Sequence, residues 1–576
     1  MSKIQHKSLF EFSGKGPGFY VSAVLIIIIF FLGFYGAVAR TWTGDDAFIS
    51  FRYAQNLIEG KGLVYNAGEK VEGYSNFLWT MLIALGMEMN LDPIDTTNAL
   101  GLVSFVLTIL LFMYISWRFF KEYSPYGVFL PITALGLLAH AHFREFATGG
   151  LETSFFTFLV SLGFSGLIFS KSRRGFLLTG LVFVLVMLTR PDGFIFYGVS
   201  LLFLILTASS VPKRIWYFLL PLILIFVPYY ILRYRYYGYP FPNTYYAKSA
   251  YLSWWSQGWY YLTLYFKAYY VFFLLPVLGV VALIKAKRSL RKITRLPLRF
   301  NPLQNSVWLS LLFSAIFTLY LVRLGGDFMF ARFFIPITPF LFYWMEVFAN
   351  RILNRKYLIP FAAAVLFATC FYRYPQEIKS LTNKVVDERY FYPKERIKEA
   401  KRQGGILKRY LKNTTAKAAI FGSQAMLAYY AEFPLTIEGE NGLTDKYIAH
   451  QPIVERVRPG HEKVAPVGYL YQREVNFLFS FGLWVFPPAG DFRDISFGEV
   501  RGSIAVYDRN LMNQLKKYSQ IKFMDFENFL DEYIKQIHTL SRSDLSDDYA
   551  FFKNFYFNHN PDPARQNVFV SILGKE

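Results

Sequence analysis

The sequence is nearly free of cysteine: its single one, Cys370, lies inside an apolar run. One cysteine excludes an intrachain disulfide. Acidic residues are also few, 40 against 61 lysines and arginines, so the formal charge is +21. Much of this basic charge lies in short segments between apolar runs, where it sets membrane topology and meets anionic lipid. A nucleic-acid partner is therefore not expected.

No internal repeat is visible, and a cleavable signal peptide is not expected. The first apolar run, residues 20–39, is longer than the ~7–15 residues of a signal-peptide core. What the sequence has in abundance is apolar surface, with 54% hydrophobic residues, 20% aromatic residues and a mean hydropathy of +0.27. This composition predicts an α-helical polytopic membrane protein of the lipid bilayer.

Apolar runs that approach the roughly 20 residues needed to cross a bilayer predict about 11 transmembrane helices. They lie near residues 20–40, 96–118, 126–142, 152–170, 175–190, 193–210, 215–232, 268–285, 305–323, 333–350 and 356–373. A cytoplasmic N-terminus puts about 20 basic residues in the inside loops and about 12 in the longer outside loops. The inside set includes Lys3, Lys7, Lys15 and the run from Lys285 to Arg299.

The sequence changes character after residue 373, where short apolar stretches mix with many charges. We therefore predict a transmembrane domain at 1–373 and a soluble domain at 374–576. An odd number of spans makes the soluble domain extracytoplasmic. Residues 418–421, Gly422-Ser423 and residues 426–430 follow the pattern of strand, turn and helix. The C-terminal domain is thus expected to be α/β.

Two adjacent carboxylates, Asp45 and Asp46, stand just after the first apolar run. Charges beside a membrane span are costly. Residues 46–59 read as an amphipathic helix in the membrane interface, and a second such helix starts near Asn76. The apolar stripe of the first helix consists of Ala47, Phe51, Ala54 and Ile58. The opposite, polar face consists of Arg52, Gln55, Asn56 and Glu59.

The two carboxylates have two interpretations, which are compatible. Thr43-Gly44-Asp45-Asp46 fits a capping box, and acids stabilise the first turn of a helix. Alternatively, one carboxylate takes the proton of an acceptor hydroxyl as that hydroxyl attacks an anomeric carbon. Capping would then hold the catalytic carboxylate in place.

Further polar residues fall at helix ends on the same outer face. They include Arg144, Glu145, Glu152, Arg190, Asp192, Asn243, Lys248, Asp327 and Arg332. Each alone is more often an interfacial anchor or a helix cap than a ligand. Together, the basic members can neutralise a lipid phosphate, and the acidic members can orient sugar hydroxyls or hold a divalent metal ion.

A series of motifs, in order along residues 44–475, resembles the AftB-type terminal arabinofuranosyltransferases of mycobacterial cell walls and their bacterial relatives. The motifs are DDAFISFRYA (45–54), GKGLVYN (60–66), VEGYSNFLW (71–79), GLET (150–153), TRPDG (189–193), PNTYYAK (242–248), GGDFM (325–329), GLTDKYIA (442–449) and GHEK (460–463). The set in this order is specific, whereas no single motif is.

The resemblance implies a GT-C glycosyltransferase, with many membrane helices and with catalysis and a soluble domain on the outer face. It implies a donor sugar linked through one phosphate to a polyprenol. Asp45 and Asp46 match the acidic motif of the first outer loop and are the expected catalytic residues. The donor phosphate and sugar are expected at Glu152, Arg190, Lys248, Asp327 and Arg332. Arg52, Glu72, Asn243 and His461 are expected to bind the acceptor or to have another role in the site.

The chain also departs from the family pattern. Gly422-Ser423-Gln424 stands in place of a Gly-Asp-like turn, which removes an acid there. The many Phe, Tyr and Lys residues do not resemble those of a mycobacterial protein. Arabinofuranose is therefore one candidate sugar among others, and undecaprenol is a candidate prenol.

The sequence thus predicts a multi-pass enzyme of the bacterial cytoplasmic membrane that transfers a sugar from a polyprenyl-phosphate donor to a cell-envelope glycan. Two alternatives stay open. One is a GT-C enzyme that glycosylates protein or lipid A, and the other is a glycolipid flippase or transporter. A transporter predicts charges near the bilayer midplane, and the sequence shows few there.

Overall fold

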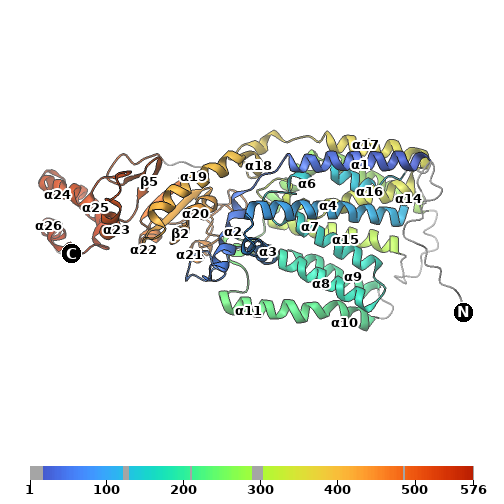
Figure 1. The fold of residues 1–576 in the computed structure, drawn as a ribbon, viewed down its shortest axis with the longest axis horizontal. Coiled ribbons are helices and arrows are strands. Elements are labelled where there is room, and N and C mark those ends of the chain that lie inside the picture. Colours follow the sequence, from blue (N-terminus) through green and yellow to red (C-terminus); the bar gives the residue numbers. More distant parts are fainter. Residues whose placement is uncertain (1–16, 121–128, 208–210, 288–301, 484–486, 575–576) are drawn as a thin grey trace. The chain divides into compact units, whose positions relative to one another are not determined.

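The computed structural model describes residues 17–120, 129–207, 211–287, 302–483 and 487–574 (Figure 1). The chain divides into two units, here called the helical unit and the sheet unit. The helical unit comprises Met1–Thr41, Ile94–Ile231 and Ser253–Leu381, and the sheet unit comprises Trp42–Pro93, Leu232–Leu252 and Thr382–Glu576. The predicted division after residue 373 lies near the last boundary, but the first outer loop and part of the second belong to the sheet unit.

The helical unit consists of apolar helices, and every range predicted as a span contains one. Its helices are α1 (Pro17–Val38), α4 (Pro93–Phe120), α5 (Ile132–Ala139), α6 (Ala141–Glu145), α7 (Thr153–Phe169), α8 (Arg173–Thr189), α9 (Gly193–Thr207), α10 (Val211–Pro221), α11 (Val227–Tyr237, which continues into the sheet unit), α13 (Trp255–Ala268), α14 (Leu274–Lys287), α15 (Pro302–Leu324), α16 (Thr338–Ile352) and α17 (Leu358–Cys370).

Four helical segments of the described residues are long and apolar enough to cross a membrane, or five if one bent pair counts as a single span. The four are Tyr20–Val38, Pro93–Phe120, Lys213–Tyr237 and Pro302–Leu324. The chain is therefore an integral membrane protein, while the count of 11 spans stays a prediction. Lys3, Lys7, Lys15 and most of the basic run up to Arg299, which set the predicted orientation, lie outside the described residues.

Two of the helical segments are interrupted. Pro221 has no amide hydrogen, and Leu222–Phe226 form a π-helical turn before the helix continues as α11. The second break separates Trp255–Ala268 from Tyr270–Val281, which meet at a bend of 96°.

Helix α13 corrects the prediction that residues 233–267 form an outer loop. Its buried residues Gly258, Tyr261 and Tyr265 recur at helical spacing. A hydropathy window does not detect such a face, because tyrosine is only weakly apolar.

The sheet unit contains one six-stranded sheet in the order β2-β1-β3-β5-β4-β6. The strands are β1 (Lys417–Gly422), β2 (Leu435–Glu438), β3 (Phe477–Phe481), β4 (Asp494–Phe497), β5 (Val500–Ile504) and β6 (Ile521–Phe523). β1 pairs with β2 and with β3 in parallel, and the other pairs are antiparallel. Gly422, with φ 84°, turns the chain from β1 into α20 (Gln424–Ala431). The predicted strand, turn and helix are thus confirmed.

The other helices of the sheet unit come from all three of its chain segments. They are α2 (Asp45–Ile58), α3 (Phe77–Glu88), α12 (Asn243–Ala247), α18 (Glu388–Phe391), α19 (Lys394–Leu411), α21 (Lys446–Ala449), α22 (Val467–Gln472), α23 (Arg509–Leu515), α24 (Phe526–Gln536), α25 (Arg542–Phe552) and α26 (Pro563–Leu573). Helices α2 and α3 confirm the two helices predicted for the first outer loop.

The surroundings of α2 differ from those predicted. The predicted polar face is largely buried, with Arg52 and Asn56 7% and 8% exposed, whereas Ile58 of the predicted apolar stripe is exposed. The reason is that α2 packs against α20, so its polar residues bind backbone carbonyls of the sheet unit instead of solvent.

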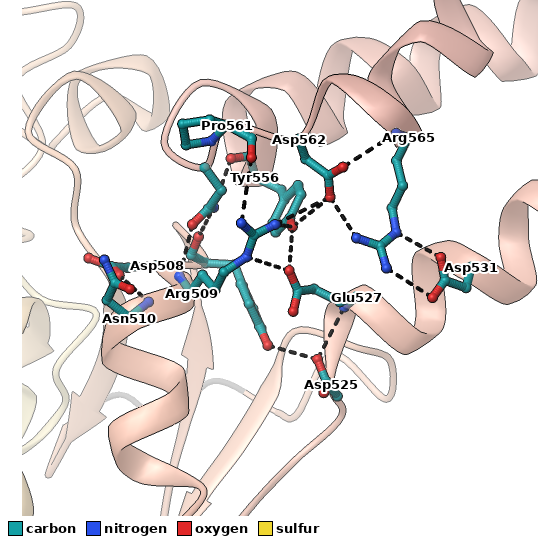
Figure 2. Close-up of polar contacts among 12 residues, drawn as sticks. Asp508, Arg509, Asn510, Asp525, Glu527, Asp531, Tyr556, Pro561, Asp562 and Arg565 are labelled. Carbon is teal, nitrogen blue, oxygen red and sulfur yellow. Dashed lines mark hydrogen bonds and ion pairs between the residues drawn. The ribbon is translucent and has the colours of Figure 1, made fainter.

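A network of charged side chains joins the C-terminal helices (Figure 2). The Tyr556 hydroxyl lies 2.7 Å from Glu527 and 3.0 Å from Asp562. Arg509 contacts the same two carboxylates, and Arg565 contacts Asp562. These contacts tie α24 to the start of α26.

Candidate active site

Four residues assigned to the donor lie together in the helical unit, each where a helix begins or ends. Arg190 follows the last residue of α8, and Glu152 precedes the first residue of α7. Asp327 follows two glycines with positive φ, and Arg332 opens a short 3-10 turn. Helix ends and turns thus carry the charges, while the apolar helices hold them in position.

These side chains form one buried charged network with Asp192. Arg190 donates to Asp192 through Nε and Nη2, at 2.9 and 2.8 Å, and its Nη1 lies 3.3 Å from Glu152 Oε1. Arg332 Nη2 lies 3.5 Å from the same Glu152 oxygen, and its Nη1 lies 3.7 Å from Asp327 Oδ2. All five side chains belong to residues that are at most 9% exposed. Three carboxylates and two guanidiniums give the network a formal charge of −1.

The two arginines of this network are held differently. The two hydrogen bonds that Arg190 donates to the Asp192 carboxylate fix its guanidinium, as in a bidentate brace. Arg332 makes longer contacts, and its buried Nε has no hydrogen-bond partner among the described residues. Arg332 is therefore the more available of the two cations for an anionic ligand.

Asp45 caps a helix, but a different one from the helix predicted. Helix α2 begins after Gly44 with no side-chain cap. The Asp45 carboxylate instead accepts the backbone amides of Ala425 at 3.1 Å and Met426 at 2.8 Å, at the start of α20. The first amides of a helix lack partners within it, so a carboxylate there satisfies them and the helix dipole.

The neighbouring Asp46 is half-buried and has neither a hydrogen bond nor an ion pair among the described residues. It stands in the first turn of α2, directly after the fixed Asp45. Burial raises the pKa of Asp45 to about 7, and the charge of Asp46 adds to this rise. Of the two carboxylates, Asp45 is thus the one held by backbone amides, and Asp46 is the one without such contacts in the described ranges.

Glu438, the last residue of β2, belongs to none of the motifs that the sequence singles out. It is 1% exposed, and its Oε2 accepts the Thr444 amide at 2.7 Å. Burial raises the pKa of Glu438 to about 8, with further contributions from the charges of Asp45 and Asp46. A glutamate that ends a buried strand was the available signal, but only the fold places it near the aspartate pair.

Arg52, assigned to the acceptor side, braces the sheet unit. Its guanidinium donates to the carbonyls of Tyr65, Ala428 and Phe433 at 2.8, 2.8 and 3.1 Å. These bonds join the first outer loop to both ends of the turn that follows α20. These hydrogen bonds account for the buried arginine on α2, so no bound ligand is needed to explain it.

Glu72 and Asn243 likewise connect distant motifs within the sheet unit. The Arg233 guanidinium forms an ion pair with Glu72, with Nε 3.0 Å from Oε1. The Asn243 side-chain amide donates to the carbonyls of Gly442 and Leu443 at 3.0 and 2.8 Å. The VEGYSNFLW, PNTYYAK and GLTDKYIA motifs therefore meet in one place.

Lys248 and His461 also lie together in the sheet unit. A Cβ on Gly460 would come within 3.3 Å of the Lys248 side chain. The His461 Nδ1 lies 3.2 Å from the Pro459 carbonyl. Burial lowers the pKa of His461 to about 3, with Arg458 and Lys248 adding to this, so the ring is neutral at pH 7. Lys248 thus belongs to a different unit from Arg190 and Arg332, and its approach to them stays a prediction.

Within the described ranges, no group of three or more His, Cys, Asp or Glu side chains has the arrangement of a metal site. The predicted divalent metal ion therefore has no assigned set of ligands.

The chain is similar to two curated proteins that share one name, terminal beta-(1→2)-arabinofuranosyltransferase. The protein of Mycobacterium tuberculosis is 32% identical over 248 residues, which cover 40% of this chain and 38% of that protein. The protein of Corynebacterium glutamicum is 29% identical over 331 residues, which cover 52% and 47%. The chain spans less than half the length of these relatives. No protein-family model matches it.

Among solved structures, the chain resembles ArnT from Cupriavidus metallidurans. The apo structure has a TM-score of 0.50 and 14% identity over 74% of this chain and 87% of ArnT. The structure of ArnT bound to undecaprenyl phosphate has a TM-score of 0.47 and 13% identity over 74% and 88%. The likeness to apo ArnT shows that the chain shares the fold of a GT-C glycosyltransferase.

Proposed function

We propose that the protein is a membrane glycosyltransferase that moves a sugar from a polyprenyl-phosphate donor to a cell-envelope glycan. The observation that carries this proposal is the aspartate pair at the start of α2. Asp45 is fixed by two backbone amides, and Asp46 beside it has no hydrogen bond or ion pair within the described part of the chain. Similarity to two proteins named as arabinofuranosyltransferases supports the reaction class and makes arabinofuranose the first sugar to test.

Asp46 acts as the general base in this mechanism. An acceptor hydroxyl attacks the anomeric carbon of the donor while Asp46 takes the hydroxyl proton. A bond forms between the acceptor oxygen and that carbon, and the bond from carbon to the phosphate oxygen breaks. The polyprenyl phosphate leaves with the electron pair. Asp45 is a positioning residue, because it fixes the helix turn that presents Asp46.

Arg332 neutralises the donor phosphate as negative charge collects on it. Its guanidinium is held more loosely than that of Arg190 and has an unsatisfied Nε. Arg190, Asp192 and Glu152 form the frame that positions Arg332. Stabilisation of developing charge by a fixed cation is among the largest contributions to catalysis.

The membrane arrangement completes the proposal. The N-terminus is cytoplasmic, about 11 helices cross the membrane, and the sheet unit is extracytoplasmic, where envelope glycans and lipid-linked donors are found. Cysteines introduced at exposed positions test this arrangement. An impermeant maleimide on intact cells should label Asn413→Cys in the sheet unit, and labelling only after lysis would contradict the orientation.

A transfer assay tests the reaction itself. Full-length protein in proteoliposomes receives polyprenyl-phosphoryl arabinofuranose and an envelope glycan, and the product is followed by mass spectrometry. Asp46→Asn should lower kcat about 10²- to 10⁴-fold, because it removes the base but keeps the shape. Glu395→Gln, which changes an exposed carboxylate elsewhere in the sheet unit, is the control and should transfer normally. An active Asp45→Asn/Asp46→Asn double variant would refute the mechanism.

The same preparation separates the alternatives. Transfer to protein or to lipid A, but not to glycan, would show that the acceptor is protein or lipid A and not an envelope glycan. Movement of the lipid-linked sugar across the vesicle membrane without a covalent product would indicate a flippase.

A further inference from the structure

The sheet unit contains a cavity of about 250 Å³ between α2 and the turn that follows α20. Its lining combines the polar face of α2 with residues from the first outer loop and from the tail. The lining residues are Arg52, Gln55, Asn56, Glu59, Lys61, Tyr65, Ala67, Lys412, Tyr429, Glu432, Phe433 and Pro434. The proposed mechanism uses none of them.

Two carboxylates on this cavity are held in place by lysines. Glu59 forms an ion pair with Lys61 and accepts from Gln55 Nε2 at 2.9 Å. Glu432 forms ion pairs with Lys408 and Lys412. A carboxylate oriented in this way retains lone pairs that can accept hydrogen bonds from a ligand.

The backbone at Glu432 is unusual. It ends α20 in the left-handed conformation, with φ 48° and ψ 43°, where glycine is the favoured residue. A side chain costs about 1–2 kcal/mol in this conformation. Strain of this kind is concentrated at ligand sites. Retaining a glutamate here keeps a carboxylate at the cavity at the expense of stability.

The remaining wall is aromatic and amide-rich. Tyr65, Tyr429 and Phe433 supply apolar surface, while Gln55 and Asn56 supply amide groups. The charged lining residues are Arg52, Lys61 and Lys412 against Glu59 and Glu432, a formal charge of +1. Apolar walls with a few fixed polar groups are typical of ligand sites, and fixed carboxylates and amides suit a ligand rich in hydroxyls.

The cavity shares α2 with the proposed base. Gln55 follows Asp46 by nine residues, which places it about 13 Å further along the helix at 1.5 Å per residue. Nine residues are about two and a half turns, so Gln55 lies on the opposite side of α2 from Asp46. Only an extended glycan can therefore reach from the cavity to Asp46 around this rigid element.

We propose that this cavity binds one sugar unit of the acceptor glycan, several units away from the hydroxyl that is glycosylated. The inference rests on the proposed function and deepens it, because it makes the enzyme select an oligosaccharide over a single sugar. Binding energy gained at this remote position holds the reacting hydroxyl at Asp46.

Glu432→Gly provides the test, since it removes the carboxylate and also relieves the left-handed strain. The fold should therefore not suffer. Glu474→Gly is the matched control, because Glu474 is also left-handed, with φ 53°, and pairs with Lys417 at 2.7 Å away from the cavity. Transfer kinetics are compared on an arabinofuranosyl hexasaccharide and on a disaccharide.

Glu432→Gly should raise KM for the hexasaccharide about tenfold, as expected for a lost hydrogen bond to a charged group, with kcat unchanged. KM for the disaccharide should stay the same, and Glu474→Gly should match the wild type on both. An unchanged hexasaccharide KM in Glu432→Gly would overturn the proposal.

A binding measurement separates this inference from the proposed function. Saturation-transfer NMR detects the hexasaccharide on the full-length protein in detergent micelles without any turnover. If the wild type binds it and Glu432→Gly does not, the cavity is a sugar site even where no transfer is found. Equal signals from the two proteins, or none from the wild type, would overturn the inference while leaving the Asp46 assay to decide the function.

Discussion

The carboxylate of Asp45 accepts the backbone amide of Met426 at 2.8 Å, across 381 positions of sequence. This contact fastens the first turn of α2 to the first turn of α20 within the sheet unit. It assigns the two adjacent aspartates to different tasks, because the Asp45 oxygens accept two backbone amides, whereas Asp46 accepts none among the described residues.

Asp45→Ala should therefore lower stability more than Asp46→Ala does. The change leaves two amides at the start of α20 without acceptors, at a cost of about 1–3 kcal/mol. Hydrogen exchange measured by mass spectrometry over residues 424–431 reports this loss directly. Faster exchange in Asp46→Ala than in Asp45→Ala would reverse the assignment.

Glu438→Gln should flatten the dependence of stability on pH. The pKa of Glu438 is about 8 in the fold against an ordinary value of 4.5. The stabilisation from its proton is complete below pH 4.5 and is lost as pH rises through 8, a change on the order of a few kcal/mol. The apparent Tm of the wild type should fall between pH 5 and pH 9, and that of Glu438→Gln should fall less. Exposed Glu395→Gln is the control, and its Tm should fall as much as that of the wild type. A wild-type fall in Tm no larger than that of Glu438→Gln would contradict the prediction.

Arg332→Gln should mainly reduce transfer, whereas Arg190→Gln should mainly reduce stability. Arg332→Gln should reduce transfer about 10²-fold or more with little loss of stability, since its contacts are long. Arg190→Gln leaves Asp192 buried without its cation and Glu152 with only the longer contact to Arg332, which costs about 3–5 kcal/mol. Transfer rates and detergent-solubilised melting curves separate the two. Similar melting curves for both variants would show that Arg190 is no brace.

Asn243→Ala should loosen the contact between the PNTYYAK and GLTDKYIA motifs. Its side chain donates to three backbone carbonyls, those of Gly442, Leu443 and Asp445. Loss of these bonds should expose residues 442–449 to limited proteolysis and lower the apparent Tm. Asn413→Ala removes an exposed asparagine as the control. Equal protection of 442–449 in the two variants would contradict the brace.

The sequence by itself determined the features that depend on local periodicity. Apolar runs located the helices of the membrane, and the 3.6-residue pattern located α2. A short apolar run followed by Gly422-Ser423 located β1 and the turn into α20. Spacing of charged motifs also indicated that Arg190, Glu152, Asp327 and Arg332 would share one face, and the structure brings these four together.

Only the tertiary structure decided which partner each charge has. Hydropathy describes a segment alone, so it did not reveal that Arg52 and Asn56 are buried, and it missed the helix Trp255–Ala268. The capping of α20 by Asp45 and the burial of Glu438 depend on packing between segments hundreds of residues apart. Neither is encoded in any window of the sequence, because a hydrogen bond requires two groups that only the fold brings within reach.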